Sequence, residues 1–336
     1  MKQMVARILL VSFGLGLGLL VCELALPFLL PASKGTEFNS IADIRRAMLS
    51  PNTETSPELG NNSLKALVDP NPNDRIIYQL KPNLNLKFMR TDVRTNSCGM
   101  RDIERAIAKA PDVYRIALLG DSFAFGWGVE QDQTFAKVLE RALNRLSDGV
   151  RKFEVLNFGV PGYSTFQEVA LFKELALQFS PDEVLVYMVD NDFGLPFFVR
   201  NVGDEGGMLS ATQFAQLAIK AIDPKIMEHK AELMRWDPNH SLLDLDKLAK
   251  ENGMRVSVVI NPGKSSRKVW DQLWALRDNS SKGMRKISLR NQILDVIKRR
   301  QIDPKDLTLS FDPHPSPLKH EILGELLASY FMDRLP

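Results

Sequence analysis

Residues 114–119 (YRIALL) form a short β-rich run, and the next four residues, 120–123, read GDSF. Apolar side chains then recur at helical spacing over residues 135–146. A strand that ends in a glycine turn and leads into a helix is the start of a parallel strand–helix–strand unit. This stretch therefore predicts an α/β fold. It also places residues 120–123 at the carboxyl end of a strand, where ligands bind in such sheets.

Three further apolar runs repeat this pattern, at residues 154–158, 183–189 (EVLVYMV) and 255–260 (RVSVVI). The second of them is almost continuously apolar, which is typical of a strand that is buried on both faces. Helical spacing predicts helices between the runs and a last helix over residues 317–332, with Pro317 in its first turn. Strands that alternate with helices predict parallel pairing and a doubly wound sheet.

The composition excludes several classes of protein. The formal net charge of the 336-residue chain is +2, which is too small to indicate a nucleic-acid partner. Two cysteines, Cys22 and Cys98, cannot supply a disulfide framework. The chain has four histidines, and no two of them have the spacing of a metal motif. We therefore predict a protein that needs neither a metal nor a cofactor.

The N-terminal segment has the character of a membrane anchor. Residues 8–30 are apolar apart from Glu23, and Lys2 and Arg7 precede them. That length crosses a bilayer as a helix, and the flanking positive charges place the N-terminus in the cytoplasm. A cleaved signal peptide is the alternative, which Glu23 and Pro27 keep open. Both interpretations place the remainder outside the cytoplasm, and the first predicts a single-pass protein of the inner membrane with its folded domain in the periplasm.

We divide the chain into three parts. Residues 1–31 are predicted to be a cytoplasmic tip and a transmembrane helix. Residues 32–62, rich in Ser, Pro, Asn and Thr, are predicted to be a linker. The globular domain covers residues 63–336. It begins with an extension over residues 63–95, in which alternating polar and apolar side chains predict edge strands, and it contains an irregular insertion over residues 193–240.

Three loops that follow predicted strands carry groups suited to acyl transfer. Ser122 is expected at the start of a helix with its hydroxyl exposed, and a serine is a nucleophile when a base removes its proton. Gly162 in the turn after the second strand and Asn191 after the third can donate hydrogen bonds to an oxyanion. Each residue alone is more simply explained as a helix cap or a loop residue. Both Gly159 and Gly162 lie in that turn.

The base is predicted in residues 311–316 (FDPHPS), just before the last helix. Asp312 and His314 lie two residues apart on an extended loop, so the carboxylate can hold the imidazole with its other nitrogen toward the serine. His320 lies further along the final helix, and we expect it to pack or to form a hydrogen bond.

The order of these blocks resembles the SGNH/GDSL hydrolase family: GDS, a glycine turn, Asn-Asp, and an Asp–His pair before a terminal helix. The resemblance implies a three-layer α/β/α, flavodoxin-like fold. It implies that Ser122 is the nucleophile and His314 the general base, oriented by Asp312. It further implies an oxyanion hole made by the backbone N–H groups of Ser122 and Gly162 and by the side-chain amide of Asn191.

The sequence departs from the family's pattern at three points. Phe123 replaces the leucine of GDSL, and Val189 stands where the third block often has glycine. Asp312 and His314 are separated by one residue, where many members have two. The shorter spacing is shared with the branch of the superfamily that acetylates exopolysaccharides such as alginate.

The resemblance runs from residue 94 to the C-terminus and includes residues 94–101 (RTNSCGMR), which are similar to a segment of membrane-anchored bacterial members. Arg101 in this segment either meets a polar substrate or has a structural role. The predicted activity is hydrolysis of an O-acyl ester, above all an O-acetyl ester, of a small molecule or a carbohydrate. Two alternatives stay open: an O-acetyltransferase for the cell envelope or an exopolysaccharide with the same triad, and a non-catalytic binding or scaffold protein.

Overall fold

A computed structural model describes Gly14 and residues 55–56, 60–61, 63–189, 192, 238–260 and 284–334. From residue 55 onward the described residues belong to one compact unit. The predicted membrane segment apart from Gly14, most of the predicted linker, Asn191 and the predicted insertion up to residue 237 lie outside the described residues. No helix in the described part of the chain is long and apolar enough to cross a membrane.

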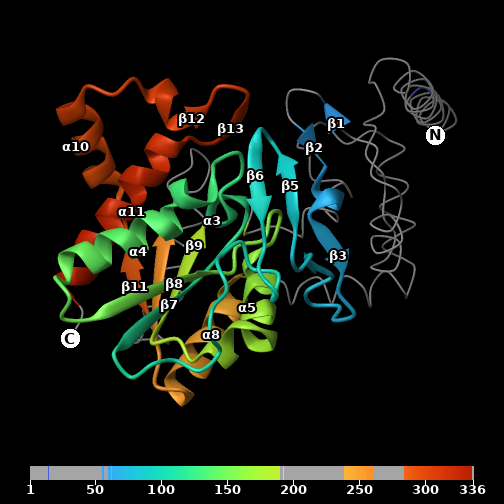
Figure 1. Cartoon of the computed structure of the whole chain (residues 1–336), viewed down its shortest axis with the longest axis vertical. Coiled ribbons are helices and arrows are strands. Elements are labelled where there is room, and N and C mark those ends of the chain that lie inside the picture. Colours follow the sequence, from blue (N-terminus) through green and yellow to red (C-terminus); the bar gives the residue numbers. More distant parts are fainter. Residues whose placement is uncertain are drawn as a thin grey trace, which may run out of the picture. The chain divides into compact units, whose positions relative to one another are not determined.

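The central sheet has five parallel strands in the order β11-β10-β9-β7-β8 (Figure 1). Counted along the chain, this is the order 2-1-3-4-5 of flavodoxin-like sheets. The predicted doubly wound parallel sheet is therefore confirmed. The strand order reverses between β7 and β9, so a crevice for ligands is expected at the carboxyl ends of these two strands. The strands are β7 (Val113–Gly120), β8 (Lys152–Asn157), β9 (Glu183–Met188), β10 (Arg255–Ile260) and β11 (Arg285–Ile287).

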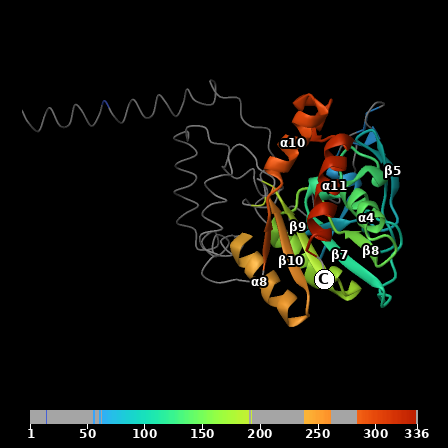
Figure 2. The same cartoon turned by 90° about the vertical axis from the view of Figure 1, so that its left-hand side faces the viewer.

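Helices cover both faces of this sheet. α4 (Phe135–Leu146) and α11 (Pro317–Met332) pack together on one face, and α5 (Thr165–Glu174) and α8 (Pro238–Glu251) on the other (Figure 2). The three-layer α/β/α architecture is therefore present, and α4 and α11 cover the predicted helical ranges. The described chain also has short 3₁₀ helices, η1 (Leu64–Ala66), η2 (Gln131–Gln133), η3 (Ala176–Phe179) and η6 (Pro304–Leu307).

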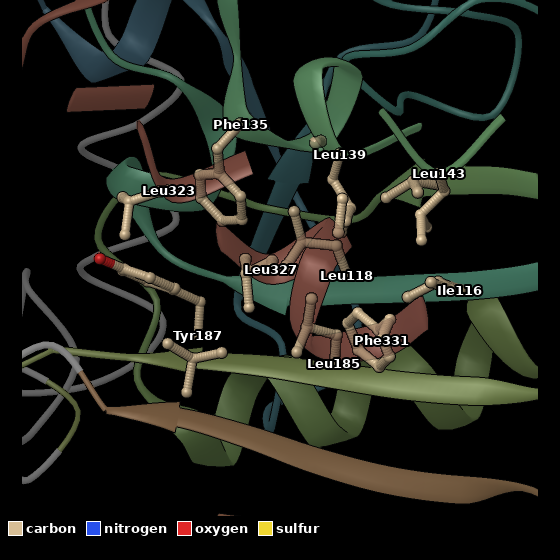
Figure 3. Close-up of a cluster of buried hydrophobic side chains, with 14 of the residues drawn as sticks. Ile116, Leu118, Phe135, Leu139, Leu143, Leu185, Tyr187, Leu323, Leu327 and Phe331 are labelled. Atoms are coloured by element: carbon tan, nitrogen blue, oxygen red, sulfur yellow. The ribbon is translucent and has the colours of Figure 1, made fainter. Parts of the chain in front are cut away.

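The larger core lies between the sheet and the pair α4 and α11 (Figure 3). Burying one large apolar side chain stabilises a fold by about 1.5–3 kcal/mol, so this packing holds α11, and the segment that precedes it, firmly against the sheet. The core contains Ile116, Leu118, Leu185 and Tyr187 from the sheet, Phe135, Leu139 and Leu143 from α4, and Leu323, Leu327 and Phe331 from α11.

Two elements at one edge of the domain were not predicted from the sequence. The strand β11 has three residues, and Arg285 and Lys286 are charged, so it has no apolar run; backbone pairing with β10 makes it a strand. The helix α10 (Arg290–Arg300) follows it and buries Val296 in a small cluster with α11. Both elements depend on neighbours that come from other parts of the chain.

The predicted edge strands between residues 76 and 94 are confirmed. β3 (Val68–Pro70) pairs with β4 (Tyr78–Leu80), and a second small sheet has the order β1-β2-β5-β6. Met89 and Arg90 between β5 and β6 both have positive φ angles, 47° and 70°, as the tight turn of a hairpin requires. The strands of the second sheet are β1 (Thr55–Ser56), β2 (Gly60–Asn61), β5 (Asn85–Phe88) and β6 (Thr91–Arg94).

His320 joins the two helices of the larger core. The expectation that it packs or forms a hydrogen bond is confirmed, because it does both. It lies on α11 and is fully buried, and its Nδ1 accepts a hydrogen bond from the Phe135 N–H at 3.1 Å. That N–H is one of the groups at the start of α4 that have no partner within the helix. The imidazole also stacks on the Phe135 ring, with centroids 5.8 Å apart and planes 14° apart. Burial lowers the pKa of His320 to about 3, so the ring is neutral in the folded protein.

We expect His320 to make the protein less stable as the pH falls. The unfolded chain binds a proton to this histidine below about pH 6.5, whereas the folded chain does not until about pH 3. The free energy of unfolding of the wild type should therefore fall relative to that of His320→Gln by up to about 1.4 kcal/mol per pH unit below pH 6.5. Urea unfolding between pH 7 and pH 4 measures the difference. His240→Gln, at an exposed position, is the control. If the free energy of unfolding changes with pH equally in the wild type, His240→Gln and His320→Gln, the prediction is contradicted.

Candidate active site

The nucleophile turn joins β7 to the short helix α3 (Ser122–Phe125). Gly120 is required in this turn, because a Cβ there would lie 2.6 Å from the Cβ of Ala124. Ser122 is the first residue of the helix, and it is 8% exposed. The turn therefore presents Ser122 at the carboxyl end of β7, beside the point where the strand order reverses.

The predicted base lies on a hairpin of β12 (Thr308–Leu309) and β13 (Asp312–Pro315). Asp312 and His314 each precede a proline, which restricts the preceding residue to extended conformations. Residues i and i+2 of an extended strand point to the same face, so the one-residue spacing brings the carboxylate beside the ring. Asp312 Oδ1 accepts hydrogen bonds from the backbone N–H of His314 at 3.0 Å and from His314 Nδ1.

The hydrogen bonds continue from His314 to the serine. His314 Nε2 lies 2.8 Å from Ser122 Oγ. Because an ionised carboxylate only accepts hydrogen bonds, Nδ1 of His314 carries the proton that faces Asp312. Nε2 of the neutral ring is then an acceptor, and the hydroxyl of Ser122 donates to it. The structure thus brings together the three residues that the sequence singled out, in the arrangement of a Ser-His-Asp site.

Asp121 is the other group close to the hydroxyl. Its Oδ1 caps α3 by accepting the Phe123 N–H at 2.9 Å, and its Oδ2 lies 3.3 Å from Ser122 Oγ. The hydroxyl has one proton to donate, and the shorter distance to His314 makes the imidazole the better acceptor. Asp121 therefore fixes the start of the helix, and His314 is placed to act on the serine.

Aromatic rings hold the imidazole in place. The Trp127 ring stacks on His314 with centroids 5.1 Å apart and planes 20° apart, and the Phe123 ring lies 5.6 Å away. Trp127 in turn packs edge-on against Phe88 of the extension, at 4.8 Å. Packing on these rings limits rotation of the imidazole, so its orientation is set before any substrate arrives.

The sequence left two roles open for Arg101, contact with a polar substrate or a structural role. Its contacts are those of a structural residue. It is 1% exposed, and its guanidinium donates hydrogen bonds to the carbonyls of Phe125 at 3.1 Å, of Gly126, and of Val129 at 2.6 Å. These carbonyls lie at the end of α3 and in the turn after it, where the helix supplies no donors. Burial lowers the pKa of Arg101 to about 10, so it stays charged at neutral pH. Arg101 therefore holds the end of the nucleophile helix in place through these carbonyls.

The turn after β8 distinguishes Gly162 from Gly159. The Gly159 N–H donates to Asn157 Oδ1 at 2.9 Å, and a Cβ at Gly159 would lie 2.4 Å from Phe125 N. Gly159 therefore packs against α3 with its N–H occupied, and it cannot serve an oxyanion. Gly162 has a φ of 79°, and neither its N–H nor that of Ser122 has a hydrogen-bond partner among the described residues. These two N–H groups remain candidate donors.

The N-terminal extension holds this turn from the other side. The Tyr78 hydroxyl donates to the Pro161 carbonyl at 2.9 Å, and the Tyr163 hydroxyl donates to the Tyr78 carbonyl. The two tyrosine rings also pack edge to face, with centroids 5.1 Å apart. The residues on both sides of Gly162 are thus tied to the extension, which is a functional reason for its strands.

Three buried polar residues that support the site were not identified from the sequence: Asn157, Glu168 and Asp192. Asn157 is fully buried, and its Nδ2 donates to the Ala124 carbonyl at 2.9 Å, which ties α3 to the turn after β8. A polar residue inside an apolar run was the one available signal. Its partner is 33 residues away in the chain, so the contact itself could not be read from the sequence.

The chain matches no protein-family model and no curated protein sequence. Its structure is similar to a protein from Desulfitobacterium hafniense DCB-2 named for the G-D-S-L family of lipolytic proteins (14% identity, covering 64% of this chain and 98% of that one, TM-score 0.37). It is also similar to the psychrotrophic esterase EstA from Pseudoalteromonas sp. (14%, 66% and 98%, TM-score 0.43) and to a lipase/acylhydrolase from Enterococcus faecalis (18%, 66% and 97%, TM-score 0.38).

At these identities and TM-scores no activity carries over from those proteins, so the function must be argued from the residues themselves. The G-D-S-L family named in the first of them is the one that the sequence blocks of this chain resemble.

Proposed function

We propose that the protein is a serine-dependent ester hydrolase of the SGNH/GDSL type that acts on an O-acyl ester, above all an O-acetyl ester. The strongest support is the series of hydrogen bonds from Asp312 through His314 to Ser122, with 2.8 Å between the imidazole and the hydroxyl. His314 and Ser122 are 192 residues apart in the chain, so their contact is a product of the whole fold.

The proposed reaction begins when Ser122 Oγ attacks the ester carbonyl carbon while His314 Nε2 takes the hydroxyl proton. The carbonyl π electrons move to the oxygen, and the N–H groups of Ser122 and Gly162, with the side-chain amide of Asn191, stabilise that charge. The protonated His314 then donates its proton to the leaving alcohol oxygen as the C–O bond breaks. Asp312 stabilises the imidazolium throughout.

The acyl group is then bound to Ser122 and needs an acceptor. Water, deprotonated by His314, releases the carboxylic acid and restores the serine hydroxyl. A carbohydrate hydroxyl in the same place makes the protein an O-acetyltransferase. We keep this as the second candidate because Asp312 and His314 have the one-residue spacing of the exopolysaccharide-acetylating branch.

The proposed location is the periplasmic side of the inner membrane, with residues 8–30 as the anchor and residues 63–336 as the catalytic domain. The support is the length and apolar character of that segment and the positive charges of Lys2 and Arg7 before it. Fractionation of cells that express the full chain tests this. Recovery of an unprocessed chain in alkali-washed membranes is expected, and a shortened, soluble periplasmic form would favour a cleaved signal peptide.

Labelling with a fluorophosphonate tests the proposed function. We expect one phosphonate group on Ser122 of the full chain, found by mass spectrometry of its peptide, because the reagent reacts with a serine that a base has activated. Ser122→Ala and His314→Ala should prevent labelling. Ser97→Ala is the control, since the Ser97 hydroxyl bonds to exposed Glu104 at 2.9 Å, and it should label like the wild type.

The outcome separates the candidate functions. A folded protein whose Ser122 is not modified would contradict the proposal and leave a binding or scaffold protein. Labelling together with ester hydrolysis supports the hydrolase. If a supplied sugar acquires the acetyl group faster than water does, the transferase is the better description.

A further inference from the structure

Three carboxyl groups are buried together beside the nucleophile: Asp121, Glu168 and Asp192. Asp121 caps α3, Glu168 lies on α5 and Asp192 follows β9, and each is at most 1% exposed. Within the described residues, this cluster included, no group of three or more His, Cys, Asp or Glu side chains is arranged to hold a metal ion.

Asp192 is placed as an acceptor that joins two turns of the site. Its Oδ2 accepts the Val189 N–H at 2.5 Å, and its Oδ1 accepts the Thr165 hydroxyl at 3.2 Å. Its own N–H donates to the Val189 carbonyl at 3.1 Å, which closes the turn after β9. Thr165 begins α5, three residues after Gly162. Asp192 thus links the turn after β9 to the turn after β8.

Glu168 has no such donors. Both of its side-chain oxygens are buried, and no protein N–H or hydroxyl bonds to them in the described part of the chain. The group that faces it is the carboxyl group of Asp192, which itself accepts from Val189 and Thr165. Burial removes the hydrogen bonds that a carboxylate makes to water. If no protein donor replaces them, burying the charged group is strongly unfavourable. Glu168 is therefore a neutral acid, and its O–H donates to Asp192.

The electrostatics of the cluster agree with this placement of the proton. Burial raises the pKa of Glu168 well above its usual range, and the charges of Asp192 and Asp121 raise it further. Burial and Asp121 also raise the pKa of Asp192, but its hydrogen bonds from Val189 and Thr165 act in the opposite direction. The shared proton therefore belongs on Glu168, which lacks other donors.

Two tyrosines also face the cluster, Tyr187 on β9 and Tyr163 before α5. Burial raises the pKa of Tyr187, and the charge of Asp121 adds to the effect. Burial also raises the pKa of Tyr163 well above its usual value, with Tyr78 and Glu168 as further causes. Both phenols therefore keep their protons to higher pH than an exposed tyrosine does.

We propose that Glu168 is a positioning residue: as a neutral acid bonded to Asp192, it holds the turns after β8 and β9 in place around Ser122. The inference rests on the proposed acyl-transfer function, because those turns carry Gly162 and the chain segment next to Asp192. When Glu168 loses its proton, its carboxylate lies next to the carboxylate of Asp192. The two negative charges then repel each other, and the hydrogen bond between the residues is lost. The turns then shift, and kcat falls while the affinity for substrate changes less.

The test compares Glu168→Gln with Glu168→Ala in the full chain, using p-nitrophenyl acetate. The glutamine N–H₂ can still donate to Asp192, so its kcat at pH 7 should stay within about threefold of the wild type. The alanine variant should lose about 10- to 100-fold in kcat, with KM changed less than about threefold, since a displacement of about 1 Å costs on the order of 10²-fold. Glu174→Gln and Glu174→Ala, on the exposed side of the same helix, are the matched controls and should behave like the wild type.

The dependence of kcat on pH gives a second test, because a residue with a merely structural role would not change it. The wild type should lose kcat as the pH rises and Glu168 ionises, at a pH above that of an ordinary glutamate, whereas Glu168→Gln has no such proton to lose and should keep its rate. Background hydrolysis is subtracted with Ser122→Ala. The same loss of kcat with rising pH in Glu168→Gln, or equal losses in the glutamine and alanine variants, would overturn the proposal.

Hydrogen exchange at the Val189 amide separates this proposal from the proposed function. Exchange should be faster in Glu168→Ala than in the wild type and Glu168→Gln, because the Asp192 carboxylate loses its support. Unchanged exchange in the alanine variant overturns the inference even if the protein is an active esterase. If exchange is faster in Glu168→Ala but the wild type neither hydrolyses esters nor labels at Ser122, the buried pair is real and its proposed role in catalysis is overturned.

Discussion

Alanine at Ser122 or at His314 is expected to lower kcat for p-nitrophenyl acetate by about a thousandfold or more, with little change in KM. Ser122→Ala removes the atom that attacks the carbonyl. His314→Ala removes the group that lies 2.8 Å from that atom and takes its proton, whereas Asp121 Oδ2 lies further away, at 3.3 Å, and already caps α3 through its other oxygen. The loss falls on kcat because both groups act on the reacting atoms.

The two changes are also expected not to add. Once either member of a triad is missing, the other has no partner to act on, so Ser122→Ala with His314→Ala should be about as slow as each single variant. A double variant that is slower than the singles by the product of their effects would mean that the residues act independently. His240→Ala, at an exposed position on α8, controls for loss of a histidine and should leave kcat unchanged. Circular dichroism must show that all variants are folded.

Retention of more than a tenth of wild-type activity in Ser122→Ala would contradict the assignment of the nucleophile. If His240→Ala lost as much kcat as His314→Ala, the loss would reflect a general effect of replacing a histidine and not a defect in proton transfer. Both results are distinguishable from unfolding, because the hydroxyl of Ser122 makes few contacts besides those to His314 and Asp121.

The parts of the fold that could be predicted are those whose signal is local. The run EVLVYMV at residues 183–189 is apolar after Glu183 because β9 is buried on both faces, and the helical spacing over residues 135–146 follows the buried side of α4. β11 could not be predicted in this way. Its backbone hydrogen bonds with β10 make it a strand, and Arg285 and Lys286 carry no such signal.

The same distinction applies to the candidate site. Ser122, Asp312 and His314 could be named because they stand in short blocks, after a predicted strand and before the last helix, whose order resembles the SGNH/GDSL pattern. The residues that support them could not. The sequence left two roles open for Arg101, and its partners, three carbonyls of which the nearest in sequence is 24 residues away, come from the fold. Glu168 reads as an ordinary helical glutamate until Asp192 is seen beside it. Burial and contacts with residues far away in the chain decide these roles, and the neighbouring residues in the sequence reveal neither of them.

Asparagine at Asp312 is expected to lower kcat at neutral pH by about 10³- to 10⁴-fold without unfolding the protein. Asp312 Oδ1 accepts from both the backbone N–H and the Nδ1–H of His314. An asparagine that turns its N–H₂ toward Nδ1 stabilises the tautomer in which Nε2 carries the proton, and that ring cannot accept the proton of Ser122. An asparagine that keeps its oxygen there still lacks the charge that stabilises the imidazolium.

The measurement is kcat for p-nitrophenyl acetate, with Asp306→Asn as the control because Asp306 is an exposed acid of the same C-terminal region. The control should retain wild-type activity. If Asp312→Asn loses less than tenfold while His314→Ala is inactive, the stack on Trp127 orients the imidazole and the carboxylate does not. The expected large loss would instead mean that the one-residue spacing, with its two prolines, builds a working Asp–His pair on an extended strand. It would follow that a second intervening residue is not a chemical requirement of such a site, since the extended strand alone places residues i and i+2 on one face.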